Sequence, residues 1–547
     1  MKRDIKRLAS DRYDLLVIGG GITGACVAAD AAMRGMKVAL VEKKDFGWAT
    51  SAATSKLIHG GLRYLKNLEF SLVRESLRER RIFEIIAPHL VYPLPFLIPT
   101  YKAGNTRYLI YPAMGLYDIL SFDKANLSDP DRRIPHATIL NKKDVLKHEP
   151  LVNTVGLTGG AIYYDCQMFS PERLTLEFLL AATENGAELA NYAGVTGLMR
   201  SGQKIEGAFV RDKETGSEFE IRAKITVNVS GPWADEISDF LRTAKKKKIV
   251  RSQGVHLITR NIVQNHAVVL RTTKGRHFFL IPWRGYTLIG TTDTRYEGDP
   301  DDYGVTSNAV DEFLNEVNEV YPAGKLNMDD VCWTYGGLRP IVEKETEIKE
   351  VYSASRKYEI YDHEKDDQIS GFFTVIGGKY TTSRHLAQKL VDQVVIKLGV
   401  GFRPCATALT PLPGGGMGSW NEFITRLNNK WPNLEHKTIE HLAKVYGART
   451  AILFDLMEKS PELALKLDSH HLEPLAVVKM AVEEEMAVHL EDVIFRRTGL
   501  GTTGNLRIDT VEKCAKLMAA SLGWNQDDVM REIKMVSGLL TQKGIKS

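Results

Sequence analysis

The N-terminal part of the chain alternates short apolar runs with a stretch of helical periodicity. The run Asp14–Ile18 leads into Gly19, and the alanine-rich residues 23–34 follow it. A second run, Lys37–Val41, stops on Glu42. Uninterrupted apolar runs of this length are typical of strands that are buried on both faces of a parallel sheet. The pattern therefore predicts a strand, a helix and a second strand, as in an α/β fold.

The alternation of strand and helix patterns returns further along the chain and then stops. Residues 159–186 predict a strand and a helix, residues 225–231 predict a strand that ends on Gly231, and residues 278–292 predict two strands. After a glycine-rich linker at 410–418, apolar residues recur at three- and four-residue spacing without strand patterns. The sequence therefore predicts an α/β part followed by a separate all-helical domain.

Three glycines after the first strand carry the strongest chemical signal. Gly19, Gly21 and Gly24 have the spacing G-x-G-x-x-G, in which the glycines permit a tight turn, admit a pyrophosphate and let the helix pack on the strand. Glu42 follows about twenty residues later, where a carboxylate accepts hydrogen bonds from a ribose diol and would repel the 2′-phosphate of NADP. The unit predicts dinucleotide binding in preference to a structural turn, but it does not separate NAD from FAD.

Two glycine-flanked segments supply further ligand-binding candidates. The loop after Glu42 is rich in small hydroxyl residues and ends on Arg63 and Tyr64, a cation beside a phenol. Its backbone could lie against a flat or phosphorylated ligand, with a polar surface loop as the alternative. The segment 372–384 places a glycine pair, a lysine and two threonines where a strand meets a helix, which suits an anionic ligand or a structural turn. The candidates in the two segments are Thr50, Ser51, Ser55, His59, Gly60, Gly378, Lys379 and Thr381.

Two side chains in the predicted strands are candidates for proton transfer and anion binding. Alternation in the run around residue 256 places His256 on the opposite face of its strand from Val255 and Leu257. Arg339 lies next to a glycine pair and a proline. Histidine is a common proton acceptor, and arginine presents a planar, permanently charged fork to anions.

Composition limits the function classes. A chain of 547 residues is too long for one core and predicts two or three domains. Its 72 basic and 68 acidic residues give a net charge of +4, which lacks the signature of a nucleic-acid-binding protein. Its 5 cysteines are scattered and never spaced C-x-x-C, as is typical of reduced thiols in the cytoplasm.

The apolar segments do not predict a membrane span. The basic N-terminus followed by residues 15–29 imitates a signal peptide, but the glycines and Asp30 favour the strand–helix unit. No other stretch reaches the roughly 18 apolar residues that a span needs. The aromatic run at 107–120 is compatible with ordinary core, which we favour, or with a surface at a lipid boundary.

No metal site is predicted. Asp299, Asp301 and Gly304 faintly imitate a calcium loop, but the positions that should supply further oxygen ligands hold Tyr303 and Val310. His470 and His471 lack a spaced set of partner ligands.

Over nearly its whole length the sequence resembles the FAD-dependent respiratory glycerol-3-phosphate dehydrogenases. The motifs that carry the resemblance are VIGGGITGACVAADAAMRG, ATSAATSKLIHGGLRYL, SGPWAD, IPWRGYTLIGTTDTRYEGDP, WTYGGLRP, GGKYTTSR and, in the helical domain, DVIFRRT. The resemblance implies a Rossmann-like FAD domain interleaved with a β-rich α+β substrate domain, as in the D-amino-acid-oxidase-like superfamily, plus an all-α C-terminal domain. The expected boundaries are FAD parts at about 12–90, 155–245 and 350–400, substrate parts at about 91–154 and 246–349, all within 1–404, and a helical domain at 405–547.

The resemblance also implies an activity. The family oxidises sn-glycerol 3-phosphate to dihydroxyacetone phosphate by hydride transfer from C2 to N5 of FAD and passes the electrons to a membrane quinone in the respiratory chain. The reaction requires a base that titrates near neutrality, and His256 is the best match by its side-chain chemistry. The resemblance places Arg339 close to the reacting carbon, where its charge could stabilise the developing alkoxide. Residues implied around the substrate are Arg63, Tyr64, Arg339, Arg356, Lys379 and Thr381. Residues implied around the cofactor are Gly19, Gly21, Gly24, Glu42, Thr50, Ser51, Ser55, Lys56, His59, Gly60, Gly231, Gly378 and Lys379.

The family further implies a homodimer in the cytoplasm, bound peripherally to the inner face of the cytoplasmic membrane. Oxidase relatives, which use oxygen, commonly contain an extra insertion that this chain lacks, and this favours the dehydrogenase. A second alternative is a flavin oxidase of amines or amino acids, which shares the glycine fingerprint and Glu42. The cations around the predicted pocket are more numerous than the single carboxylate of such a substrate needs, so this alternative ranks lower. A non-catalytic flavin-binding sensor is the third alternative.

Overall fold

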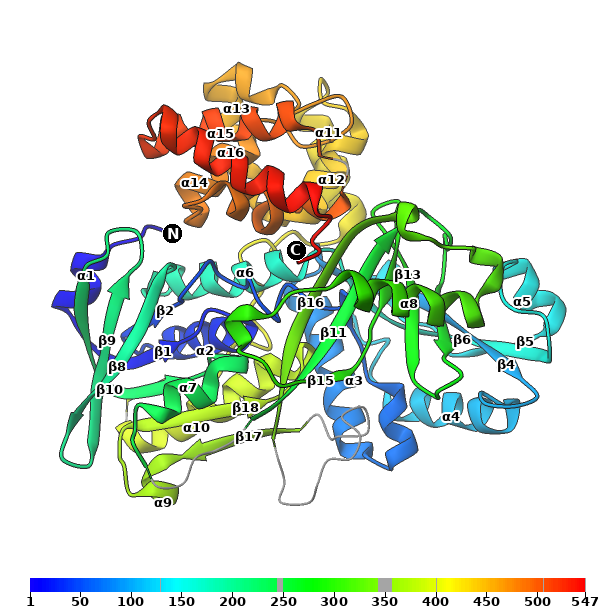
Figure 1. Cartoon of the computed structure of the whole chain (residues 1–547), viewed down its shortest axis with the longest axis horizontal. Helices are drawn as coiled ribbons and strands as arrows, with labels where there is room; N and C mark the ends of the chain where they lie inside the picture. The colour runs from blue at the N-terminus through cyan, green and yellow to red at the C-terminus, as the bar shows by residue number, and fades with distance from the viewer. Residues whose placement is uncertain (128, 244–248, 343–356, 400, 505, 547) are drawn as a thin grey trace.

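A computed structural model describes residues 1–127, 129–243, 249–342, 357–399, 401–504 and 506–546. Figure 1 shows two sheets side by side, with a body of helices lying over one end of both. The amino-terminal half of the chain contributes to both sheets, and the helical body is formed by the C-terminal residues.

The first sheet is built around the predicted N-terminal strand. Strand β1 pairs in parallel with β10 on one side and β2 on the other, and β2 and β10 continue in parallel to β7 and β18. Its order is β17-β18-β10-β1-β2-β7, with the antiparallel strands β8 and β9 joined through β10. The strands are β1 (Arg12–Ile18), β2 (Val38–Val41), β7 (Glu188–Ala190), β8 (Ala193–Ser201), β9 (Lys204–Asp212), β10 (Glu218–Asn228), β17 (Tyr358–Asp362) and β18 (Phe372–Gly377).

The second sheet is mainly antiparallel. Its order is β15-β11-β14-β13-β12-β4-β6-β3, with β16 paired to β11 and β5 to β6. The strands are β3 (Leu57–Ile58), β4 (Val91–Tyr101), β5 (Thr138–Asn141), β6 (Leu157–Met168), β11 (Ile249–Thr259), β12 (Ala267–Arg271), β13 (His277–Trp283), β14 (Tyr286–Gly290), β15 (Thr294–Tyr296) and β16 (Val331–Val342).

The two sheets alternate along the chain, but one boundary differs from the expectation. Strand β6 was assigned to the FAD part because its apolar run precedes a helix, as a parallel strand of the first sheet would. In the structure β6 pairs antiparallel with β4 in the second sheet. The short strand β3, at the end of the same sheet order, pairs antiparallel with β6. The run is buried on both faces in either sheet, so its hydrophobicity carries no information about its partner.

Helices cover the first sheet, and α4 and α8 pack apolar side chains against strands of the second. Helix α2 packs between α6 and α10, and its alanines let these helices approach closely. The helices of this part are α1 (Ile5–Ser10), α2 (Ile22–Met33), α3 (Phe70–Ile86), α4 (Arg107–Leu120), α5 (Lys142–His148), α6 (Pro171–Glu184), α7 (Ala234–Asp239), α8 (Ser307–Val320), α9 (His363–Asp367) and α10 (Ser383–Leu398).

The C-terminal domain is helical, as predicted. The residues with helical spacing at 475–497 form α14, which ends at Glu485, and a π-helical turn at Asp492–Arg497. The backbone of Thr334 in β16 donates to the carbonyl of Lys543, so the C-terminus returns to the second sheet (Figure 1). The helices are α11 (Trp420–Lys430), α12 (His436–Tyr446), α13 (Thr450–Lys459), α14 (Ala476–Glu485), α15 (Ile508–Leu522) and α16 (Gln526–Thr541).

The aromatic run at 107–120 forms α4, which has one face in the core and the other exposed. Its Tyr117 is buried, whereas Tyr108 is 77% and Ile119 70% exposed. Within the described ranges, no helix has the length and apolar character needed to cross a membrane.

Buried His89 makes the stability of the protein sensitive to acid. Its ring lies 3.9 Å from Glu177 and finds no hydrogen-bond partner among the described residues. Burial, with Arg173 and Arg132 nearby, lowers the pKa of His89 to about 3. Below its ordinary pKa of about 6.5 the unfolded chain binds a proton that the folded chain refuses, so stability falls as the pH drops from about 6.5 toward 3.

We expect His89→Gln to remove this acid dependence. Urea unfolding at a series of pH values between 7 and 4 should give a shallower loss of stability in the variant, by up to about 1.4 kcal/mol per pH unit. His136→Gln is the control, because that ring is 84% exposed. Equal slopes in His89→Gln and the wild type would contradict the prediction.

Candidate active site

A cavity of about 2000 Å³ lies between the two sheets and gathers segments that are far apart in the sequence. Its walls include the ends of β1 and β2, the loop after Glu42, the turn after β18, and strands of the second sheet. Among the residues implied by the resemblance, those that line it are Gly19, Gly21, Glu42, Thr50, Ser51, Ser55, His59, Arg63, Tyr64, Gly231, His256, Arg339, Gly378, Lys379 and Thr381.

The glycine fingerprint forms the turn between β1 and α2. A Cβ atom on Gly24 would lie 1.9 Å from the carbonyl oxygen of Gly19, so only glycine lets the helix approach the strand this closely. The first turn of α2 faces the cavity, where its N–H groups favour an anion. The Ser51 hydroxyl accepts a hydrogen bond of 2.9 Å from the Ile22 N–H and so joins the hydroxyl-rich loop to the start of the helix.

Glu42 is held at the end of β2 by three donors. The Gly20 N–H donates to Oε2 at 2.7 Å, and the Lys44 N–H and the Trp48 indole N–H each donate to Oε1 at 3.0 Å. Burial raises the pKa of Glu42, and these hydrogen bonds oppose the shift because they favour the carboxylate. The arrangement presents a fixed acceptor beside the glycine turn, as a ribose diol requires. The residues therefore fit an adenine dinucleotide without a 2′-phosphate.

Cations gather at another part of the cavity wall. The ammonium of Lys379 lies 2.6 Å from Ser76 Oγ and 4.6 Å from the centre of the Tyr64 ring, and the Arg63 guanidinium lies over the same ring at 4.9 Å. Burial lowers the pKa of Lys379. Two cations that contact one aromatic ring and line a cavity form a site for an anion.

Arg339 projects from β16 across the neighbouring strand β11. Its Nη2 donates to Thr291 Oγ1 at 2.9 Å, and its Nη1 lies 3.7 Å from Asp293 Oδ1. A Cβ atom on Gly254 would lie 2.1 Å from Nη2, so this glycine makes the space that the guanidinium fills. Arg339 is thereby held against the sheet with part of its fork toward the cavity.

His256 lies in β11 on the face predicted from alternation, with Val255 and Leu257 in the core on the other side. Its ring stacks on Tyr335 with a centroid distance of 4.9 Å, and Nε2 is 2.9 Å from Ser55 Oγ. Nδ1 has no hydrogen-bond partner among the described residues.

The structure differs from the expectation that His256 titrates near neutrality. Burial, with the charges of Arg339 and Lys56 nearby, lowers its pKa well below the ordinary value. The imidazole is therefore neutral at physiological pH, and it is a weaker base than an exposed histidine. Solvent exposure is what keeps an ordinary histidine near pKa 6.5, and this ring has almost none.

Four implied residues are not on the cavity wall. Gly24 lies in α2, where it allows the helix to pack closely on β1. Lys56 is buried behind the wall, 3.5 Å from Glu172 and over the Trp283 ring at 4.7 Å. Gly60 donates its N–H to Asp165, and a Cβ atom there would lie 2.3 Å from the Tyr117 hydroxyl. Arg356 lies outside the residues that the structure describes.

Several residues that position the site were missed from the sequence. Asp165 accepts hydrogen bonds from Gly60, Tyr117 and Arg80, and so holds the glycine pair that precedes Arg63. Gly254 makes room for Arg339. A glycine in the middle of a strand is itself a signal of close approach, so Gly254 could have been found. Asp165 had no such signal, because its partners come from other elements. Among the described residues, no cluster of side chains suited to a metal ion is present.

Comparisons with known proteins agree with this geometry. Residues 14–381 match the family described as FAD dependent oxidoreductase, and residues 405–529 match the C-terminal domain of alpha-glycerophosphate oxidase. The chain is 35% identical to a glycerol-3-phosphate dehydrogenase of Synechocystis sp. over 99% of each protein. It is also 35% identical to an aerobic glycerol-3-phosphate dehydrogenase of Staphylococcus aureus, over 90% of this chain and 88% of that protein.

A solved structure agrees in both fold and cofactor. The X-ray structure of the glycerol-3-phosphate dehydrogenase from Bacillus halodurans complexed with FAD superposes with a TM-score of 0.80 at 30% identity, covering 99% of this chain and 97% of that one. The predicted fold class, an FAD-binding α/β fold with a helical C-terminal domain, is confirmed, and FAD is the cofactor.

Proposed function

The chain belongs to the family of FAD-dependent glycerol-3-phosphate dehydrogenases, and from this premise we propose that it oxidises sn-glycerol 3-phosphate to dihydroxyacetone phosphate. One observation carries the proposal. A single cavity combines a dinucleotide cradle around Glu42 with a cation cluster and a buried neutral histidine. A phosphorylated secondary alcohol needs these three features together: an oxidant, a phosphate site and a proton acceptor.

The cations provide the phosphate site in this proposal. Lys379 and Arg63 both lie within 5 Å of the centre of the Tyr64 ring, at 4.6 and 4.9 Å, and the backbone N–H of His59 donates to Thr381 Oγ1 at 3.3 Å. A phosphate that binds here is fixed by positively charged side chains rather than by water. A fixed phosphate orients the carbon chain of the substrate. The free energy of phosphate binding is thereby used to align C2 with the groups that react with it.

The protein's own residues manage the proton and the developing charge. When bound, FAD supplies the two-electron acceptor that takes the hydride from C2 at N5. We propose that His256 takes the hydroxyl proton, since it is neutral, lies on the cavity wall and is held by Tyr335 and Ser55. The fixed charge of Arg339 stabilises the alkoxide that develops as the proton leaves.

We also propose that the electrons pass to a quinone at the inner face of the cytoplasmic membrane, where the protein is bound peripherally as a homodimer. Helix α4 supports the membrane contact. It carries exposed Tyr108, Leu109 and Ile119, and Leu109 and Pro112 also line the cavity. Aromatic and aliphatic side chains on one exposed helix are suited to a lipid boundary.

Anaerobic flavin bleaching tests the proposed reaction. Addition of sn-glycerol 3-phosphate to the purified yellow protein without oxygen is expected to remove the flavin absorbance, whereas glycine and L-proline leave it unchanged. Bleaching by an amine or amino acid in place of the phosphate ester would overturn the assignment.

Reoxidation tests the acceptor in the same cuvette. A soluble quinone analogue is expected to restore the absorbance much faster than dissolved oxygen does. Faster reoxidation by oxygen would identify the protein as an oxidase instead.

A further inference from the structure

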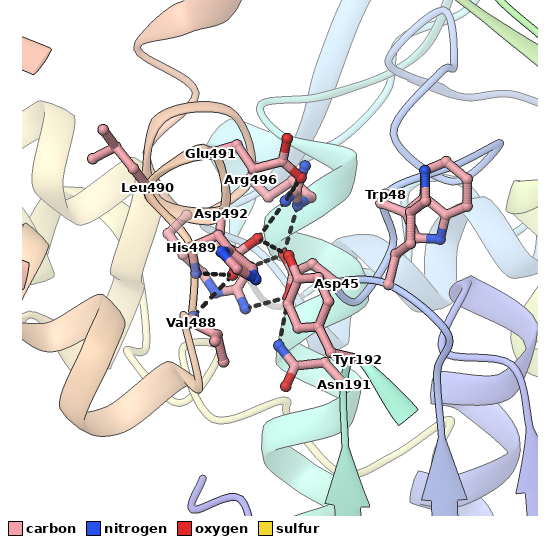
Figure 2. A network of polar contacts seen from close by, with 12 residues as sticks. Asp45, Trp48, Asn191, Tyr192, Val488, His489, Leu490, Glu491, Asp492 and Arg496 are labelled. Carbon is pink, nitrogen blue, oxygen red and sulfur yellow. Dashed lines mark hydrogen bonds and ion pairs between the residues drawn. The ribbon is translucent and has the colours of Figure 1, made fainter. Parts of the chain in front are cut away.

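A buried polar network joins the C-terminal domain to the loop that follows Glu42. In Figure 2, Asp45 from that loop meets Arg496 and Asp492 from the π-helical turn and Asn191 from the loop between β7 and β8, while Trp48 points away from the cluster. Asp45 and Asp492 are fully buried. None of these residues is used in the proposed oxidation.

Asp45 is the centre of the network. Its oxygens accept hydrogen bonds from Arg497 at 2.7 and 2.9 Å, from Arg496 at 2.5 Å and from the side-chain amide of Asn191 at 3.0 Å. Burial alone would raise the pKa of Asp45, but the charges of Arg497 and Arg496 hold it well below its usual value. The carboxylate is therefore permanently charged. It forms a bidentate salt bridge with Arg497, and bidentate contacts are the strongest common form of this ion pair.

A second carboxylate fixes the arginines. Asp492 accepts hydrogen bonds from the Tyr192 hydroxyl at 2.6 Å, from the backbone of Val488 and His489, and from Arg496. Arg496 thus lies between two buried carboxylates, one from each domain. Arg496 also pairs with Glu491 at 3.0 Å, whereas Arg497 directs both of its terminal nitrogens at Asp45, so removal of the Asp45 charge leaves the buried Arg497 without its counter-charge.

His489 adds a contact at the edge of the network. Its ring bonds Glu532 of α16 at 2.9 Å and Glu214, in the turn between β9 and β10, at 3.1 Å. Burial would lower its pKa, but the hydrogen bonds to Glu214 and Glu532 raise it to about 10, so the ring is positively charged at neutral pH.

The network reaches the cofactor site through two neighbours of Asp45 in the loop. Lys44 and Trp48, on either side of Asp45, supply both N–H groups that donate to Glu42 Oε1. The side chain of Asp45 points into the domain interface, whereas Lys43, Gly47 and Trp48 line the cavity. The loop is therefore held from one side by the C-terminal domain and holds Glu42 on the other.

We propose that the C-terminal helical domain is part of the FAD site, and that Arg496 and Arg497 act through Asp45 as positioning residues for Glu42. Docking of the domain fixes the turn that carries Lys44 and Trp48. Loss of the contact releases this turn, so Glu42 loses two of its three donors and its fixed position. The proposal concerns retention of FAD and is independent of the substrate and of the electron acceptor.

Release of FAD from the purified holoenzyme tests the proposal. We expect Asp45→Asn to release FAD about 10-fold faster or more after dilution, measured as the rise in flavin fluorescence. Arg496→Lys keeps the charge but loses the guanidinium that bridges Asp45 and Asp492, and we expect it to speed release in the same direction and by less. Hydrogen exchange of residues 43–50 in FAD-free protein is expected to quicken in both variants.

Glu485→Gln is the matched control. Glu485 is also buried at this domain interface, and its side chain pairs with Arg173 of α6 at 2.6 Å and has no described contact with residues 43–50. Its main-chain carbonyl accepts hydrogen bonds from Arg497, and the substitution leaves that carbonyl in place. We expect this variant to lower the urea midpoint while its rate of FAD release stays at the wild-type value. Equal acceleration of FAD release in Asp45→Asn and Glu485→Gln would show that the network only stabilises the domain interface, and this would contradict the proposal. An unchanged rate of FAD release in Asp45→Asn would overturn the proposal as well. Wild-type FAD release is measured without substrate, so a failure of the proposed oxidation leaves this result intact.

Discussion

Replacement of Arg339 by methionine is expected to slow flavin reduction by sn-glycerol 3-phosphate about 100- to 1,000-fold at saturating substrate. The guanidinium is held on the cavity wall by Thr291 and Asp293, and Gly254 provides the space for it. A charge fixed in this way stabilises a developing alkoxide without having to reorganise. Methionine fills a similar length without the charge, so the loss reports the electrostatic contribution. Stopped-flow absorbance under anaerobic conditions measures the rate.

Arg295→Met is the control for this prediction. Arg295 also lines the cavity, but its side chain is 50% exposed and pairs with Glu297 at 3.2 Å. The control removes the same charge from the same cavity, and we expect its rate to stay within a few-fold of the wild type, because solvent screens an exposed charge. If Arg339→Met retained a rate within fivefold of Arg295→Met, Arg339 would have no special role. Full FAD content in both variants excludes loss of the cofactor as the cause.

Gly24→Ala is expected to give the second large effect, a protein that is purified without FAD or that does not fold. The added methyl group would lie 1.9 Å from the carbonyl oxygen of Gly19 and 3.0 Å from its carbonyl carbon. Backbone atoms cannot move aside as a flexible side chain does, so α2 must shift from β1. We expect the free energy of unfolding to fall by about 3 kcal/mol or more. The helix N-terminus would then no longer point at the pyrophosphate site.

Gly115→Ala provides the matched control in another helix. Gly115 lies within α4, and an added Cβ atom meets nothing within 4 Å. Alanine is the better helix former, so this variant should gain roughly 0.5–1 kcal/mol. The flavin-to-protein absorbance ratio and urea unfolding measure both variants. Full flavin content in Gly24→Ala would show that the close approach of α2 is not needed for binding.

Much of the cofactor site could be predicted from the sequence because its signals are local. The strand, the three glycines, the helix and Glu42 lie within one stretch of thirty residues, and each has a mechanical reason for its spacing. His256 was found in the same way, since strand alternation alone separates it from Val255 and Leu257. Backbone geometry determines these relations, and no distant residue is required.

The sequence did not determine which sheet each strand belongs to. Strand β6 has an apolar run that suits either sheet, and its pairing with β4 is a long-range choice. The core interpretation of α4 holds for only one of its faces, because an aromatic composition is common to buried helix faces and to exposed ones. In both cases the sequence pattern predicts the strand or helix but does not determine which element it packs against.

The sequence by itself determined the FAD-binding unit, the alternation of two sheets, the helical C-terminal domain and the family. The tertiary structure alone decided the ionisation of His256 and the contact of Asp45 with Arg497, which lie 452 positions apart in the chain. A pKa depends on burial and on charges brought close by folding, and a buried ion pair depends on two domains meeting at one point. Local patterns are properties of short segments, whereas these features are properties of the packed molecule.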